Sequence, residues 1–249
     1  PVISLNANGM ETNEGFRISP ALLLDAAHGV VLGDLLMRCL YRVRPYELTK
    51  GSANALHRKW RDICIDSLTS AHPKYSYARL CRGIVADFDA FPIDETLKKP
   101  RVGVVGEILV KYMPLANNHV VDLLEREGAE AVVPDLLDFF AATIYEQDFK
   151  RTHFGKGRTA SMVAKLGVPA LQRMRRPAIE ALKASRRFAP PMAIDHVAEL
   201  AKPFLSIGNQ YGEGWFLAGE MAELITSGTP NIVCIQPFAC LPNHVVGKG

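Results

Sequence analysis

A cysteine between two prolines is the residue in this sequence that is best suited to chemistry. It is Cys240, in a loop that directly follows an apolar run, and Pro237 and Pro242 stiffen that loop on either side. A thiol fixed in this way can present its thiolate to a metal or an iron–sulfur cluster. Asn243 and His244 follow closely and would shape its surroundings as neighbouring donors. A structural role in ordering the loop is the alternative.

A single cysteine does not hold an iron–sulfur cluster, because such clusters usually take four ligands. Any cluster at Cys240 would therefore need further cysteines from an upstream part of the protein or from another chain. A dry pocket favours cluster reduction at low potential. We expect the apolar flanks of the loop to supply it, namely Val233, Ile235, Phe238 and Leu241.

Polar side chains also occur in two segments that precede helical patterns. The first contains Glu107, Asn117 and Asn118, and the second places Glu213 between two glycines. Those glycines permit a tight turn and a close approach of the backbone to a ligand. We expect the four side chains to line a ligand cleft, although Glu213 also fits an ordinary helix start beside the helix dipole. The glycine spacing matches neither the dinucleotide fingerprint nor the P-loop.

The elements that must position these segments alternate between strands and helices. An apolar run over 101–106 predicts a buried parallel strand, and the runs over 130–133 and 231–236 predict two more. A loop over 107–117 and a helix over 118–127 connect the first two strands, and a helix over 215–226 precedes the last. This alternation predicts an α/β sheet fold, whose ligands bind beyond the carboxyl ends of the strands.

Helical patterns account for most of the remaining chain. One begins with Ser19 as its N-cap and Pro20 at the first helical position, and it runs to Pro45. Two more start near Ser52 and near Ser76. Helices dominate again over 136–205, where we expect breaks at residues 155–157 and at the prolines 177, 190 and 191.

The patterns divide the chain into two parts. Residues 1–97 are expected to be mostly helical and to continue from a missing upstream α/β domain, with a strand over 1–5. Residues 98–249 are expected to form an α/β domain that carries a helical insertion over about 136–205 and is truncated at its carboxyl end.

Composition and cysteine usage exclude several classes of protein. The chain has 249 residues, 48% of them hydrophobic, and a net charge of +3, which excludes a disordered, collagen-like or coiled-coil protein. None of the five cysteines forms a C-x-x-C pair, which excludes zinc ribbons, and we expect a reducing cytoplasm. Cys39, Cys64 and Cys81 lie in amphipathic helical patterns, where a thiol packs as a small hydrophobic group.

Membrane and nucleic-acid partners are not expected either. No apolar run reaches the ~18 residues that a spanning helix needs. The basic residues concentrate between Arg173 and Arg187, where a solvated helix face is the favoured interpretation over a nucleic-acid surface.

Four stretches of the chain resemble a known family. They are RPYELTKG, RVGVVGEILVKYMPLANNHVVDLLEREGAE, GEGWFLAGEM and NIVCIQPFACLPNHVVGKG. In this order they look like the C-terminal region of the large fused CoA-substrate-specific enzyme activases of the 2-hydroxyacyl-CoA dehydratase system. The resemblance covers essentially the whole chain, and QPFACLPNHVVGKG is its most specific motif. Family members often have Gly where this chain has Ala239.

The resemblance implies a Rossmann-like α/β domain similar to the cluster-carrying dehydratase subunits. In that system an activase hydrolyses ATP and passes one electron to a dehydratase, which removes water from a 2-hydroxyacyl-CoA by radical chemistry. Cys240 is the position that inherits a [4Fe–4S] role, and the cluster itself is expected in the full-length parent rather than in this fragment. The ATP-binding module is expected outside this chain, so the fragment alone should be inactive.

Two functions from different classes remain open at this point, and binding of a small molecule in the cleft without a metal is a weaker third. In the first, the chain contributes to an iron–sulfur and acyl-CoA cleft for low-potential electron transfer or radical dehydration. Its partners are then the remaining domains of the parent chain, an acyl-CoA ligand and a redox protein. In the second, it is a scaffold or partner-binding module without a metal, and Cys240 is a packed loop residue.

Overall fold

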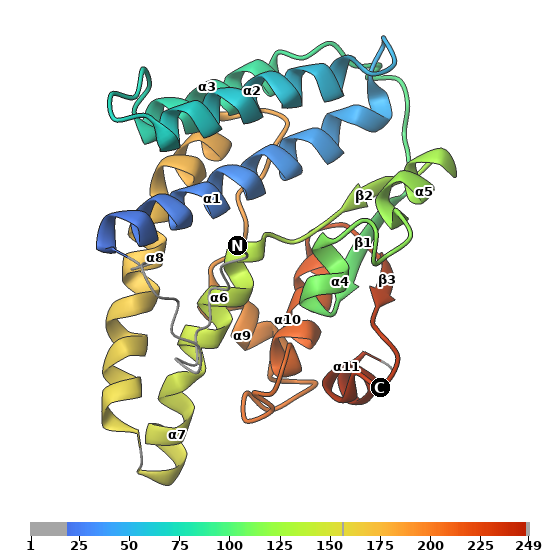
Figure 1. The fold of residues 1–249 in the computed structure, drawn as a ribbon. Helices are drawn as coiled ribbons and strands as arrows, with labels where there is room; N and C mark the ends of the chain where they lie inside the picture. Colours follow the sequence, from blue (N-terminus) through green and yellow to red (C-terminus); the bar gives the residue numbers. More distant parts are fainter. Residues whose placement is uncertain (1–18, 156, 248–249) are drawn as a thin grey trace.

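The computed structural model describes residues 19–155 and 157–247. Over these residues the protein is mostly helical and contains a small parallel sheet, so the predicted mixed α/β class is confirmed. The strand expected over 1–5 lies outside the described residues. Figure 1 shows long helices α1 to α3 along one side and the sheet with α10 and α11 on the other.

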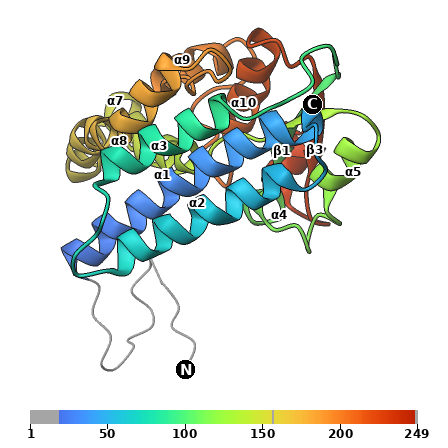
Figure 2. The same cartoon turned by 90° about the horizontal axis from the view of Figure 1, so that it is seen from above.

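The amino-terminal helices form a layer of their own. Helix α1 spans Pro20–Val43, and α2 spans Ser52–Thr69 with a short 3-10 helix, Arg44–Tyr46, between them; α3 spans Tyr77–Asp89. Figure 2 shows the three helices side by side. The hydroxyl of Ser19 accepts a hydrogen bond from the Leu22 amide at 3.1 Å, so the predicted N-cap is confirmed.

One buried apolar cluster joins this layer to the later helices. It includes Cys39 and Phe88 from the amino-terminal helices together with Leu137 and Leu182 from the second half of the chain. Cys39, Cys64 and Cys81 are buried, as predicted for small packing groups. Burial raises the pKa of the Cys64 thiol to about 11 and that of the Cys81 thiol to about 12, so both stay protonated and inert.

The sheet has three parallel strands in the order β2-β1-β3. Strand β1 is Arg101–Gly106, β2 is Glu130–Val132 and β3 is Asn231–Ile235, within one residue of each predicted range. Gly106 has φ +124°, and a Cβ there would lie 1.8 Å from the carbonyl oxygen of Ile235. Only glycine therefore lets the end of β1 approach β3 this closely.

Short helices occupy the expected loops on either side of the sheet. The segment predicted as a loop over 107–117 contains α4, Ile108–Tyr112, and the helix predicted over 118–127 is α5, Val120–Arg126. Helix α10 is Gly214–Thr226, and α11 is Leu241–Val246. The carboxylate of Glu107 caps the amino end of α4, because its Oε2 accepts the amide of Val110 at 2.8 Å.

The helical insertion consists of α6, Leu136–Tyr145; α7, Gln147–Phe154; α8, Arg158–Ala184; and α9, Ile194–Ala201. The break predicted at Pro177 is wrong, since α8 continues through both Pro169 and Pro177. Each proline removes one backbone hydrogen bond. Packing of α8 against α3, α6 and α7 offsets that loss and keeps the helix continuous.

The arginine-rich stretch is only in part the solvated face that was expected. Arg173, Arg176 and Arg186 are exposed, but two other arginines of the stretch are not. Arg175 is 4% exposed and forms ion pairs with Asp135 and Asp138, the latter at 2.5 Å. Helix α8 ends at Ala184, so Arg187 lies beyond it, and its side chain is 10% exposed. Charge patterns gave no sign of these burials, because the carboxylates that pair with Arg175 come from a distant segment.

Helix α1 with the following turn, over Pro20–Tyr46, is long and apolar enough by composition to cross a membrane. Leu23 is 63% exposed near its start, whereas Leu32 and Leu35 further along are buried in the core. Core helices pass the same compositional test, so the absence of a membrane partner stays a prediction.

Candidate functional site

The candidate site lies where the direction of winding around the sheet changes. From β1 the chain moves to β2 on one side, and it returns to β3 on the other side of β1. In open parallel sheets, ligands bind beyond the carboxyl ends of strands at such a point. The two strand ends are joined there, because the Glu107 amide donates to the carbonyl oxygen of Ile235 at 2.9 Å.

Glu213 ties the segments that follow β1 and β3 to the start of α10. It is 4% exposed. Its Oε1 accepts the Ile108 amide at 2.7 Å, and its Oε2 accepts from Nδ2 of Asn243 at 2.8 Å. Gly214 permits the turn that follows, because it has φ +45° and a Cβ would lie 2.0 Å from the carbonyl oxygen of Asn209. The Glu213 carboxylate therefore joins three segments, namely the one after β1, the one after β3 and the start of α10, and we call it the pin.

Asn243 connects this pin to the cysteine. Its side chain is fully buried, and the same Nδ2 that donates to Glu213 also lies 3.1 Å from the Sγ of Cys240. Its Oδ1 is buried without a hydrogen-bond partner among the described residues. Cys240 itself is half-buried, at the residue before α11. The chain Glu213–Asn243–Cys240 thus fixes the thiol at the end of the sheet.

His244 is adjacent in sequence but takes part in a different contact. Its Nδ1 lies 3.0 Å from Nε2 of Gln236, and this pair is exposed. The imidazole therefore braces the loop between β3 and α11. The backbone amide of His244 donates to the carbonyl oxygen of Cys240 at 3.0 Å, but among the described residues no hydrogen bond joins the imidazole to the Cys240 sulfur.

The asparagines expected in the cleft have local roles. Nδ2 of Asn117 donates to the carbonyl oxygen of Val110 at 2.8 Å, and its Oδ1 accepts the Val120 amide at 3.2 Å. Asn118 has φ +54°, a left-handed conformation that asparagine tolerates. These two residues shape the turn between α4 and α5. Of the predicted set, the structure brings together Glu213, Asn243 and Cys240, with Glu107 capping the helix beside them.

A buried ion pair under the site was missed in the sequence. Nζ of Lys111 lies 2.7 Å from Oε1 of Glu220, and both side chains are 1% exposed. Burial raises the pKa of Glu220, and the ammonium of Lys111 opposes that effect. A lysine within the apolar run ILVKY and a glutamate within FLAGEM were the available signals.

The side chains at this site can supply one ligand to an iron–sulfur cluster but not a complete set of ligands. The described residues contain no group of three or more histidine, cysteine or acidic side chains arranged to hold a metal ion. The resident chemistry is a single hydrogen-bonded thiol. The other ligands of a four-ligand cluster would have to come from elsewhere.

The surface around the thiol is apolar and open. Phe238 is 100% exposed and Leu241 72% exposed, so these two flanks do not enclose a dry pocket as expected. The segments that meet at this end of the sheet expose further large apolar side chains, namely Leu109, Met113, Leu115, Tyr211 and Val245. Exposed apolar side chains are typical of an interaction site where they form one continuous patch.

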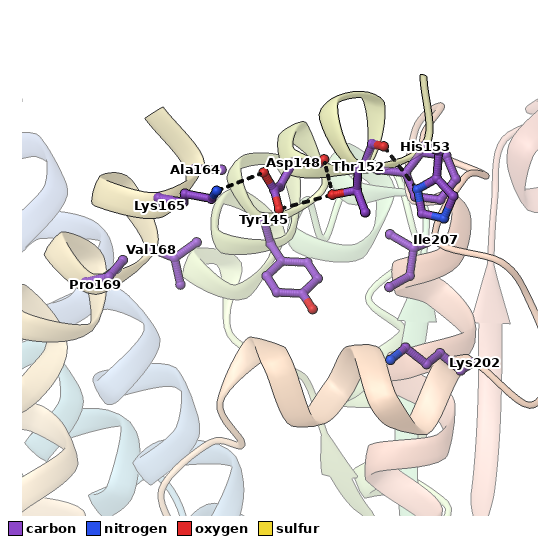
Figure 3. Close-up of a pocket in the computed structure, with 11 residues that line it drawn as sticks. Tyr145, Asp148, Thr152, His153, Ala164, Lys165, Val168, Pro169, Lys202 and Ile207 are labelled. Atoms are coloured by element: carbon purple, nitrogen blue, oxygen red, sulfur yellow. Dashed lines mark hydrogen bonds and ion pairs between the residues drawn. The ribbon is translucent and has the colours of Figure 1, made fainter. Parts of the chain in front are cut away.

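A cavity lies away from the sheet, between α7, α8 and the end of α9. Its volume is about 490 Å³. Figure 3 shows the Tyr145 ring and Val168 in this cavity, with Asp148, Lys165 and Lys202 around it. Nζ of Lys165 lies 3.9 Å from Oδ1 of Asp148. The cavity has the size of a small-molecule site, but the sequence gave no motif there.

No family model, curated protein or solved structure matches this chain. The resemblance to the CoA-substrate-specific enzyme activases therefore stays a prediction.

Proposed function

We propose that this chain is a Rossmann-like, cytoplasmic domain of an activase-related protein of the 2-hydroxyacyl-CoA dehydratase system. Its part in that protein is to supply one thiolate, Cys240, to a [4Fe–4S] cluster beside an acyl-CoA cleft. The observation that carries this proposal is the hydrogen bond from the buried Asn243 amide to the Cys240 sulfur.

A donor to sulfur has a direct chemical consequence. An N–H group directed at a cysteine sulfur stabilises the negative charge of the thiolate, and such bonds tune the potential of a bound cluster. Glu213 holds the Asn243 amide in that orientation, because its Oε2 accepts the second hydrogen bond that Nδ2 can donate. A cysteine that served only to pack would not need a buried amide locked onto its sulfur.

The remaining ligands are assigned to another segment or chain that covers the exposed apolar side chains at this end of the sheet. Phe238 and Leu241 flank Cys240 and lie open to solvent, and their burial would exclude water from the cluster. Low-potential electron transfer requires such a dry surrounding.

The test measures iron and acid-labile sulfide in the full-length protein purified without oxygen. Cys240→Ala should lose most of the bound iron and the visible absorbance of the cluster. Cys234→Ala is the matched control, since Cys234 is also partly buried and lies on β3. Equal iron content in wild type and Cys240→Ala would refute the ligand role.

A second candidate is a metal-free module that binds a partner protein through the same apolar surface. The incomplete donor set and the full exposure of Phe238 favour it. In that case Phe238→Ser should abolish co-purification of the partner, while Cys240→Ala leaves both the partner and the iron content unchanged.

A further inference from the structure

Four arginines line a pocket that runs along β2 beside the amino end of β1, and we call it the arginine pocket. They are Arg38 and Arg42 from α1, Arg101 from β1 and Arg187 after α8. The pocket has a volume of about 280 Å³ and also contains Glu130. Helix α1 packs against β2 here, so the pocket has walls from both halves of the chain (Figure 1).

Glu130 holds two of these arginines in place. It is 2% exposed and sits at the first position of β2. Its Oε2 accepts from Nη1 of Arg42 at 3.0 Å and from the Tyr46 hydroxyl at 2.8 Å, while its Oε1 accepts from Nε of Arg101 at 3.1 Å. One buried carboxylate therefore orients two guanidinium groups in advance of any ligand.

The positive charge of the pocket exceeds its negative charge. Glu130 is shared between Arg42 and Arg101, and neither Nε nor Nη2 of Arg42 makes a hydrogen bond with the described residues. Arg38 pairs with Asp135, but that carboxylate is shared with the buried Arg175. The pocket thus contains guanidinium N–H groups that a ligand can use.

Arg187 is the most enclosed of the four. Its Nη1 donates to the carbonyl oxygens of Phe88 at 2.9 Å and Phe91 at 2.8 Å, and its Nη2 lies 3.8 Å from the exposed carboxylate of Glu95. Burial lowers the pKa of Arg187, and the carboxylates of Asp89 and Glu95 only partly oppose this. The Glu95 carboxylate is exposed and is 3.8 Å away, so a bound anion would add to the stabilisation of the largely enclosed Arg187 cation.

A second hollow adjoins the first. Its volume is about 420 Å³, and Arg42 and Arg187 line both hollows. Tyr46, Ile93, Leu97 and Arg186 also line it, together with the carboxylates of Asp94 and Glu95. Sites of a few hundred cubic ångströms accept small organic ligands. The two arginines at the junction are therefore placed to hold the charged group of a molecule whose remainder extends into the second hollow.

We infer that the arginine pocket binds the phosphate group of a small phosphorylated ligand. Guanidinium groups approach from α1, β1 and the segment after α8, which suits an anion with acceptor oxygens on several sides. Phosphate offers at least three such oxygens, and arginine pairs with them in a planar, bidentate geometry. A carboxylate has two oxygens in one plane and would leave one of the three directions unused.

This pocket is separate from the site at Cys240. Arg101 begins β1 and Gly106 ends it, so the two sites lie at opposite ends of the strand, about 16 Å apart at ~3.3 Å per residue. The inference does not depend on the proposed function, because it requires no metal and none of the residues around the thiol.

The test is calorimetric titration of the full chain with inorganic pyrophosphate and with adenosine diphosphate at constant ionic strength. Wild type should bind at least one of them saturably at one site per chain. Arg42→Gln should weaken that binding about tenfold or more, because a charge-assisted contact is lost. In this variant Glu130 still accepts hydrogen bonds from Arg101 and Tyr46, so the fold should persist.

Arg82→Gln is the matched control, since Arg82 is exposed on α3 and lies outside the pocket. It should leave the affinity unchanged. Should urea denaturation show that Arg42→Gln is unfolded, Arg101→Gln takes its place with the same expected loss. Absence of saturable binding of both probes, unchanged affinity in the pocket variant, or an equal loss in Arg82→Gln would each overturn the inference.

Discussion

Replacing Glu213 by glutamine keeps the size of the side chain and removes one of its two acceptor oxygens. In the native protein these oxygens accept the Ile108 amide at 2.7 Å and Nδ2 of Asn243 at 2.8 Å. Both distances are in the range of charge-assisted hydrogen bonds. In Glu213→Gln the amide nitrogen must face one of the two donors, so one interaction becomes a donor–donor contact.

The cost follows from the burial of the group. Glu213 is 4% exposed, so water does not replace the lost acceptor. A hydrogen bond to a charged group contributes about 1.5–3 kcal/mol, and a buried donor without a partner costs about 1–3 kcal/mol. Some relaxation is available, because the Asn243 amide can rotate. We expect Glu213→Gln to lower the free energy of unfolding by about 2–4 kcal/mol.

Urea denaturation at neutral pH measures this change, and Glu107→Gln is the matched control. Glu107 accepts a single amide, that of Val110, and glutamine keeps an oxygen for it. Its replacement should cost less than about 1 kcal/mol. If Glu213→Gln costs no more than Glu107→Gln at equal m-values, then Glu213 does not act as the pin between the three segments.

Three further predictions concern buried charges and the end of β1. Arg175→Met should lower the free energy of unfolding by about 3–5 kcal/mol in urea, because it leaves the buried Asp138 carboxylate without its cation. Burial raises the pKa of Glu223 from 4.5 to about 7. Above pH 4.5 the carboxyl group ionises more readily in the unfolded chain than in the native protein, so this group lowers the free energy of unfolding, and the loss is complete above pH 7. Glu223→Gln should therefore stabilise the protein by about 1–3 kcal/mol near pH 8, and this gain should vanish near pH 4.5 in thermal melts across pH. Gly106→Ala should cost about 2–4 kcal/mol in urea, since its Cβ would lie 1.8 Å from the Ile235 oxygen.

Each of these variants has a control of the same chemical type. Arg176→Met removes an arginine that is 72% exposed and should change stability by less than about 1 kcal/mol. Glu127 is exposed, so Glu127→Gln should show no pH-dependent gain in stability of the kind expected for Glu223→Gln. Gly33→Ala adds a Cβ with nothing within 4 Å inside α1 and should be neutral or stabilising. If a variant and its control change the free energy of unfolding equally, the physical reason given for that variant is wrong.

Local patterns predicted the elements whose signals are local. The range 101–106 of β1 and the cap at Ser19 were both correct, because an apolar run and an N-cap each act over a few residues. Pro177 was predicted to break a helix and does not, since packing with distant helices compensates the lost hydrogen bond. The burial of Arg175 also depends on partners 37 and 40 positions away.

The candidate site was only partly predictable for the same reason. The rule that ligands bind beyond the carboxyl ends of parallel strands correctly grouped Glu213, Asn243 and Cys240. The rule does not say where a side chain points. Asn117 turns back to its own loop, and the pair of Lys111 with Glu220 joins two segments that no sequence spacing relates.

The pairing of β1 with β3 imposes an order on folding. More than 120 residues separate the two strands, so their pairing must overcome a large loop-closure entropy. Most helices lie between or before them and can form from nearer contacts. We therefore expect the last strand to dock late. The hydrogen bond between the Glu107 amide and the Ile235 carbonyl oxygen, which joins the two strand ends at the candidate site, would then form in a chain whose helices are already in place.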